Sequence, residues 1–245
     1  GYTSGSTGHP RGVMLSHQSL VTETTIVANW CQQTDKDIAM LFALPMHHVI
    51  GLVVVLLTSI SRGSTVIMLP GLSIDSLWET IEREQSTIFM GVPFVFALAV
   101  NANKEAGVKH NLSSLRLCVG GGSAMPLNVT KQFEERYGLP LLQLWGLTEA
   151  SGITTLQPLD DMGKLGSIGK VMPGWKLKVV DDNGKELPPN QPGELIISGP
   201  IMKGYYNNPR ATAEAIRDGW LYTGDIGKVD EDGYLFLLAR KRELI

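Results

Sequence analysis

The sequence predicts an α/β protein, with a mostly parallel sheet flanked by helices and then a smaller antiparallel β subdomain. Up to about residue 165, short runs that are apolar on both faces alternate with helical patterns, which is typical of parallel strands joined by helices. Beyond that point, apolar and polar positions alternate and Gly-containing turns separate the runs, which is typical of antiparallel strands. A hydrophobic fraction of 43% over 245 residues is sufficient for a sizeable core.

The first helix of the α/β part is expected directly after Ser16. This residue can cap a helix whose apolar positions include Leu20, Val27 and Trp30. The longest apolar run, 49–57, is predicted to be a buried helix, because crossing a bilayer takes ~20 residues.

Further helices and strands alternate along the rest of this part. One helix is capped by Ser73 or Asp75, and another runs over 127–137 and ends at Gly138. The strands between the helices are expected at 64–69, 87–90, 115–119 and 139–144. In the second part, strands are expected at 175–180, 193–198 and 233–238, and a helix at 211–217.

Charge and cysteine content exclude several classes of protein. With 21 Lys and Arg against 24 Asp and Glu, the net charge is −3, so the basic surplus of a nucleic-acid-binding protein is absent. The sequence has no CxxC spacing. We expect Cys31 and Cys118 to be buried free thiols of a protein in a reducing, cytoplasmic compartment, without a transmembrane segment.

The opening segment YTSGSTGHPRG is the first of several polar clusters. Gly allows backbone N–H groups to approach an anion closely, Ser and Thr add donors, and Arg11 adds charge. The segment does not match GxxxxGK[ST], the phosphate loop of the P-loop NTPases. Taken alone, it fits a polar flexible terminus equally well.

The next clusters follow predicted elements of the α/β part. In LPMHH, the paired His residues beside an apolar helix favour a cap and a packed residue over a metal site. The segments GGGSAMP and WGLTE each follow a buried strand, at the edge where open α/β sheets bind ligands. Close-packed Gly can admit a flat ring, Trp145 can stack on it, Thr148 can donate, and Glu149 can hold Mg²⁺. Alone, each segment fits a turn or a helix start.

The last clusters are YTGD and ARKRE. One carboxylate, Asp225, can accept hydrogen bonds from two vicinal ribose hydroxyls, and Arg240 can bridge ribose and phosphate. A surface turn and a solvated run of charges explain the same residues when each stands alone.

Taken in order, YTSGSTGHPRG, LPMHH, GGGSAMP, WGLTE, YTGD and ARKREL resemble the successive core motifs of the adenylate-forming superfamily. This superfamily includes acyl-CoA ligases, luciferases and nonribosomal peptide adenylation domains. The surrounding sequence is most similar to that of bacterial fatty acyl-CoA ligases. The resemblance implies a partial N-terminal domain, with an α/β nucleotide- and acyl-binding part over 1–165, a β-rich subdomain over 166–239 and a hinge segment over 240–245.

The resemblance also implies roles for individual residues. The phosphate-binding loop comprises Thr3, Ser4, Gly5, Ser6, Thr7 and Gly8, with Arg11 where the family usually has Lys. The catalytic residues are His48 at the acyl site, Thr148 as a phosphate contact and Glu149 as the Mg²⁺ ligand. The remaining nucleotide contacts are Gly121, Gly122, Ser123, Trp145, Gly146, Asp225 and Arg240, and Arg242 occupies the hinge position.

The resemblance implies ATP-dependent activation of a carboxylic acid, a fatty acid in the family members it most resembles, followed by thioester formation with CoA. ATP, Mg²⁺ and CoA are the implied cofactors. The family's C-terminal domain and the start of its N-terminal domain have no counterpart in the sequence, so we expect little or no ligase activity from this segment by itself. Two other readings stay open: a synthetase or adenylation domain that loads a carrier protein, and a non-catalytic nucleotide-binding module. A Rossmann oxidoreductase is disfavoured, because no GxGxxG fingerprint is present.

Overall fold

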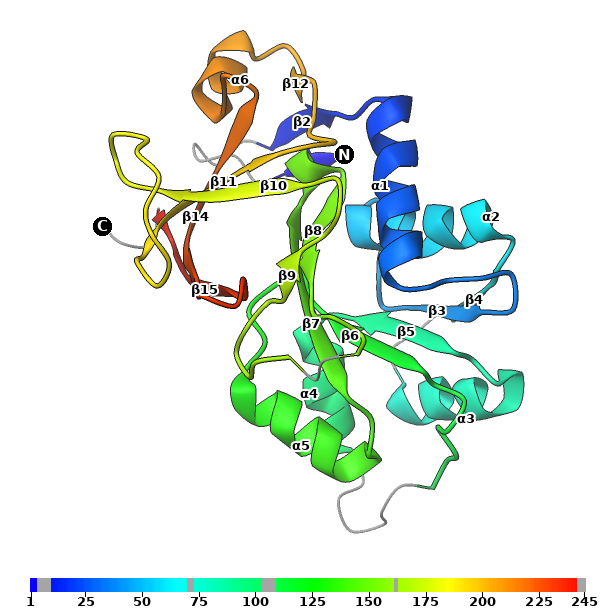
Figure 1. Ribbon diagram of the computed structural model, residues 1–245. Helices are drawn as coiled ribbons and strands as arrows, with labels where there is room; N and C mark the ends of the chain where they lie inside the picture. Colours follow the sequence, from blue (N-terminus) through cyan, green and yellow to red (C-terminus); the bar gives the residue numbers. More distant parts are fainter. Residues whose placement is uncertain (4–9, 70–72, 103–108, 161–162, 242–245) are drawn as a thin grey trace.

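A computed structural model describes residues 1–3, 10–69, 73–102, 109–160 and 163–241. Its largest feature is a seven-stranded sheet in the order β4-β3-β5-β6-β7-β8-β9 (Figure 1). The pairs from β4 to β7 are parallel, and β8 and β9 continue the sheet in antiparallel fashion. The strands are Ile38–Phe42 (β3), Thr65–Leu69 (β4), Ile88–Gly91 (β5), Leu117–Gly120 (β6), Leu141–Leu147 (β7), Gly152–Leu156 (β8) and Lys170–Val171 (β9). The predicted mostly parallel sheet is thereby confirmed.

Both faces of this sheet are buried, because successive side chains of a strand point to opposite faces. In β3, Ala39 and Leu41 belong to one apolar cluster, while Met40 and Phe42 belong to the other. The first cluster also contains residues of α1 (His17–Trp30), and the second contains residues of α3 (Ile74–Glu84), α4 (Pro93–Asn101) and α5 (Leu127–Tyr137). Helices therefore cover both faces (Figure 1).

The ends of the helices follow the predicted chemistry. The Ser16 side chain accepts a hydrogen bond from the backbone of Ser19 at the start of α1, and Ser73 caps α3. Gly138 ends α5 with a φ of 65°, a left-handed conformation that favours glycine. The predicted buried helix is a π-helix, Ile50–Leu57, followed by α2 (Thr58–Arg62). None of the helices in the described ranges is long and apolar enough to cross a membrane.

The second part forms an antiparallel sheet in the order β10-β11-β14-β13, with β15 paired to β14. Its strands are Lys176–Val180 (β10), Gly193–Ser198 (β11), Ile216–Arg217 (β13), Trp220–Val229 (β14) and Leu235–Arg240 (β15). A third, small sheet joins Tyr2–Thr3 (β1), Arg11–Met14 (β2) and Gly204–Tyr205 (β12). Helix α6, Pro209–Ala215, follows β12. The small sheet links the start of the chain to its last third (Figure 1).

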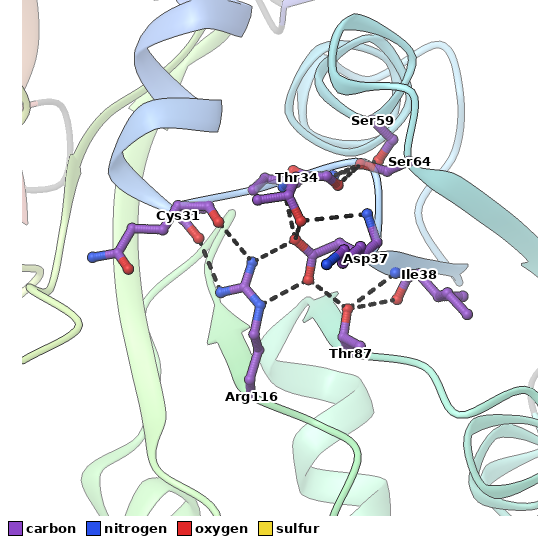
Figure 2. A network of polar contacts seen from close by, with 11 residues as sticks. Cys31, Thr34, Asp37, Ile38, Ser59, Ser64, Thr87 and Arg116 are labelled. Carbon is purple, nitrogen blue, oxygen red and sulfur yellow. Dashed lines mark hydrogen bonds and ion pairs between the residues drawn. The ribbon is translucent and has the colours of Figure 1, made fainter.

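A polar network holds the amino ends of β3, β5 and β6 together (Figure 2). Arg116 donates from Nε to Asp37 Oδ1 at 2.7 Å and from Nη2 to Oδ2 at 2.9 Å, and its Nη1 donates to the Cys31 carbonyl. Thr87 donates to Asp37 Oδ1, and the Thr34 N–H donates to Oδ2. Burial alone would raise the pKa of Asp37, but these donors outweigh it and lower the pKa to about 2. This network ties together the amino ends of the strands, whereas the polar segments GGGSAMP and WGLTE follow the carboxyl ends of β6 and β7.

Candidate functional site

A cavity of about 590 Å³ lies where the large sheet, the small sheet and the antiparallel sheet meet. Eight of the predicted site residues line it, and they come from segments that are far apart in the sequence. They are Thr3, Arg11, His48, Gly122, Gly146, Thr148, Glu149 and Arg240. Ser4, Gly5, Ser6, Thr7, Gly8 and Arg242 lie outside the described residues. The cavity thus gathers at least one residue from each of the LPMHH, GGGSAMP, WGLTE, YTGD and ARKREL segments, and three from the described ends of the opening segment.

Thr148 and Glu149 reach the cavity because β7 ends directly before them. They begin a short 3-10 turn, Thr148–Ala150, and Ser151 then reverses the chain with a φ of 61°. The close antiparallel pairing of β7 and β8 requires Gly146, because a Cβ there would lie 2.1 Å from the Gly152 carbonyl oxygen. A side chain at position 146 would therefore displace the turn that carries the two site residues.

His48 lies at the end of the loop that follows β3. The loop begins at Ala43, whose φ of 56° is unusual for a residue other than glycine. His48 Nδ1 accepts a hydrogen bond from the Ile50 N–H at 3.2 Å, which ties the ring to the start of the following helix. Partial burial lowers the pKa of His48, and the neighbouring His47 lowers it further. His48 therefore presents a neutral ring to the cavity at neutral pH, beside the apolar residues Val49 and Ile50.

Asp225 is 1% exposed and lies behind the cavity wall rather than in its lining. Its Oδ2 accepts a hydrogen bond from Trp145 Nε1 at 3.0 Å, and its Oδ1 lies 2.8 Å from Arg240 Nε. The Arg240 contact is an ion pair without good hydrogen-bond alignment, which leaves Oδ1 without an aligned donor among the described residues. Burial raises the pKa of Asp225, and Arg240 and Trp145 partly oppose that rise.

The position of Trp145 does not match the stacking role that the sequence analysis predicted for it. The residue is 6% exposed, and its indole N–H is used by Asp225. Gly146 and Leu147 line the cavity, whereas Trp145 does not. Among the glycines of the GGG run, Gly122 lines the cavity with a φ of 89°, and Gly121 packs against Leu144.

Tyr205 is a site residue that the sequence analysis missed. Its hydroxyl donates a hydrogen bond to Glu149 Oε1 at 2.8 Å, and the Arg11 guanidinium lies 5.2 Å from the centre of its ring. All three residues line the cavity. Tyr205 lies 56 residues after Glu149 in a segment without a polar cluster, so only the pairing of β12 with β2 brings it to the site.

The donor set fits a magnesium ion and a nucleotide. Mg²⁺ takes oxygen ligands, typically one or two carboxylates completed by water and substrate phosphates. Glu149 and the Thr148 hydroxyl provide such oxygens on the cavity wall. Within the described ranges no group of three or more His, Cys, Asp or Glu could hold a metal by itself, as a structural zinc site would require. Asp225 lies behind this wall, and its Oδ1 is paired with Arg240, which does line the cavity.

Comparison with known proteins identifies the family. The model of the AMP-binding enzyme family matches residues 1–206, and the chain therefore belongs to that family. It is 36% identical over its whole length to a long-chain-fatty-acid–CoA ligase of Bacillus subtilis (strain 168), of which it covers 44%. It is also 36% identical over its whole length to a feruloyl-CoA synthase of an Amycolatopsis species, of which it covers 49%.

A solved structure confirms the fold. The o-succinylbenzoate coenzyme A synthetase of Bacillus subtilis, in complex with ATP and a magnesium ion, matches with a TM-score of 0.88 and 31% identity. The match covers the whole of this chain and 50% of that one. The chain thus spans about half the length of the relatives it matches. The resemblance inferred from the motifs is confirmed at the level of acid–CoA ligases that form an adenylate.

Proposed function

We propose that the protein containing this chain activates a carboxylic acid, specifically a fatty acid, by adenylation with ATP and then transfers the acyl group to CoA. The observation that carries the proposal is the single cavity in which Arg11, His48, Thr148, Glu149 and Arg240 converge. These residues come from four separate parts of the chain, Thr148 and Glu149 being neighbours, and each has the chemistry that one part of the reaction requires.

In the first step, a carboxylate oxygen bonds to the α-phosphorus of ATP and the bond to pyrophosphate breaks. Two anions must approach each other, so the site has to offset their repulsion. Arg11 contributes positive charge and the Thr148 hydroxyl contributes a donor for phosphate oxygens. Glu149 would hold Mg²⁺, which supplies further neutralisation of phosphoryl charge when bound.

The nucleotide would be held from the opposite side of the cavity. Arg240 lies on the cavity wall and pairs with the buried Asp225 carboxylate behind it, and we assign both residues to the ribose side of the nucleotide. We assign Gly122, Gly146 and the adjoining Gly121, Ser123 and Trp145 to the adenine side. In this arrangement Trp145 supports Asp225 through its N–H.

The acid would enter beside His48. The neutral imidazole neighbours Val49 and Ile50, and this mixture of one polar ring with apolar side chains suits a carboxylic acid with an apolar chain. Holding the acid there supplies proximity to the α-phosphorus. In the second step, the CoA thiol attacks the acyl carbonyl carbon, the bond to AMP breaks and the thioester forms.

The test is a screen for pyrophosphate release by the intact protein. Saturated fatty acids of increasing length are compared with aromatic acids such as ferulate, with ATP and Mg²⁺ present. We expect release with fatty acids and its loss in Glu149→Gln. A preference for aromatic acids would contradict the fatty-acid assignment, and no release with any acid would contradict adenylation. Product formation with free CoA, compared with a carrier protein, tests the acceptor, and the 245-residue segment alone is expected to be nearly inactive.

A further inference from the structure

The Glu149 carboxylate lies on a short turn but is held from outside that turn. Its side chain is only partly buried on the cavity wall, where a carboxylate has rotamer freedom. Met202 and Tyr205 contact Glu149 at two points, the first at its backbone and the second at its carboxylate. The Met202 N–H donates to the Glu149 carbonyl at 2.8 Å, and the Tyr205 hydroxyl donates to Glu149 Oε1 at 2.8 Å.

Tyr205 is itself firmly placed. Its side chain is 7% exposed, and its backbone N–H donates to the Thr212 hydroxyl of α6 at 2.8 Å. Its strand β12 pairs with β2, where Tyr205 lies opposite Val13. The Arg11 guanidinium of the same β2 lies over the ring, an attraction that a desolvated cation and an aromatic face provide. The hydroxyl therefore projects from a ring with little freedom to move.

The hydrogen bond from Tyr205 affects the orientation of the Glu149 carboxyl group. A hydrogen bond to Oε1 orients the plane of the carboxyl group and so determines where Oε2 points. Groups that hydrogen-bond a metal ligand in this way commonly set metal affinity although they do not touch the metal. The Arg11–Tyr205–Glu149 chain also connects the strand that follows the opening Gly-rich segment to the carboxylate.

We propose that Tyr205 is a positioning residue that orients Glu149 for Mg²⁺ when ATP binds, with Arg11 steadying its ring. The inference rests on the proposed function, because it takes Glu149 as the Mg²⁺ ligand. It assigns to Tyr205 a role in metal-dependent nucleotide binding rather than in packing alone.

The test is calorimetric titration of the intact protein with ATP, without a carboxylic acid so that no turnover occurs. Titrations run over a series of Mg²⁺ concentrations and in EDTA, on wild type, Tyr205→Phe, Glu149→Gln and the double variant. Tyr206→Phe is the matched control, because Tyr206 is adjacent but 67% exposed. Tyr205→Phe keeps the ring under Arg11 and removes only the donor.

We expect Tyr205→Phe to need about 10-fold or more Mg²⁺ for the same ATP affinity. Its ATP affinity in EDTA should equal that of wild type, which also shows that the variant is folded, and Tyr206→Phe should behave as wild type throughout. When Glu149→Gln is already present, adding Tyr205→Phe should not change the Mg²⁺ dependence of ATP affinity any further. An unchanged Mg²⁺ dependence in Tyr205→Phe, or an equal effect with and without Glu149, would overturn the inference alone. If the ATP affinity of wild type does not depend on Mg²⁺, the proposed function is overturned, and the inference with it.

Discussion

Replacing Glu23 with Gln is expected to change how the stability of the protein depends on pH. Glu23 lies in α1 and is 0% exposed. Its Oε1 accepts from the Ile153 N–H at 2.7 Å and its Oε2 accepts from Trp175 Nε1 at 3.0 Å, but within the described residues no salt bridge reaches it. Burial raises its pKa from 4.5 to about 8, although both hydrogen bonds oppose that rise.

The sign of the effect follows from where the proton is held. Between about pH 4.5 and 8 the unfolded chain releases the Glu23 proton while the folded protein keeps it, so the free energy of unfolding falls as pH rises. With these two pKa values, the loss between about pH 5 and pH 8 is about 3 to 4 kcal/mol. Above the folded pKa the loss levels off, because both states are then ionised.

The assay is urea unfolding of wild type and Glu23→Gln at several pH values from about 5 to 8. Gln cannot ionise, so the variant does not lose this stability as pH rises. Relative to wild type, its free energy of unfolding should therefore rise by about 3 to 4 kcal/mol between about pH 5 and pH 8. All other titrating groups are common to both proteins and cancel. Glu79→Gln, a substitution at an exposed residue of α3, is the control and should run parallel to wild type. Parallel curves for wild type and Glu23→Gln would refute a protonated, buried Glu23.

Three further substitutions test the packing around the site and the opposite edge of the sheet, each by urea unfolding. Arg116→Met should lower the free energy of unfolding by about 2 to 3 kcal/mol near pH 7, because it leaves the Asp37 carboxylate buried without its cation. The difference in unfolding free energy between the two proteins should narrow as pH falls through 3.8 towards about 2, because Asp37 becomes protonated. A difference independent of pH would contradict the pairing. Gly146→Ala should cost about 2 kcal/mol or more, because its Cβ meets a backbone oxygen of β8; wild-type stability would contradict the close approach. Trp145→Phe should cost about 1 to 3 kcal/mol, because Asp225 loses its indole donor, and an unchanged midpoint would show that this hydrogen bond is not formed.

The sequence predicted best those features that depend on neighbouring residues. Ser16, Ser73 and Gly138 mark helix ends by their own local hydrogen bonding or backbone preference, and all three do so in the structure. The mostly parallel sheet followed from strands that are apolar on both faces, and the two core clusters explain why they are so.

Several strands were not predicted, and for two of them, Ile38–Phe42 and Trp220–Val229, the physical reason is clear. Only Ala43 separates Ile38–Phe42 from LPMHH, and alanine is not a residue that marks a turn in sequence. Trp220–Val229 contains Gly224 and Asp225, which locally favour a turn, and Gly224 indeed has a φ of 73°. Pairing with both β11 and β15 nevertheless keeps the segment in the sheet. Tertiary contacts there outweigh the local preference.

For the candidate site, the sequence identified residue types but not their partners. Glu149 was predicted from its motif, whereas its hydrogen bond to Tyr205 depends on a strand pairing that no local pattern encodes. Asp225 was assigned a ligand role, but its contact with Trp145 arises only where two sheets meet, and its contact with Arg240 arises only from the pairing of β14 with β15. Glu23 lies at helical spacing between Leu20 and Val27, on the predicted apolar face, but its charged side chain did not predict full burial.

The most direct test of carboxylate activation follows an oxygen atom. The intact protein is incubated with ATP, Mg²⁺, CoA and a fatty acid labelled with ¹⁸O in its carboxylate, and the products are analysed by mass spectrometry. Attack of the carboxylate on the α-phosphorus followed by thioester formation leaves one labelled oxygen in AMP, and this is the result we predict. Label in inorganic phosphate with release of ADP, or AMP without label, would contradict the adenylation mechanism.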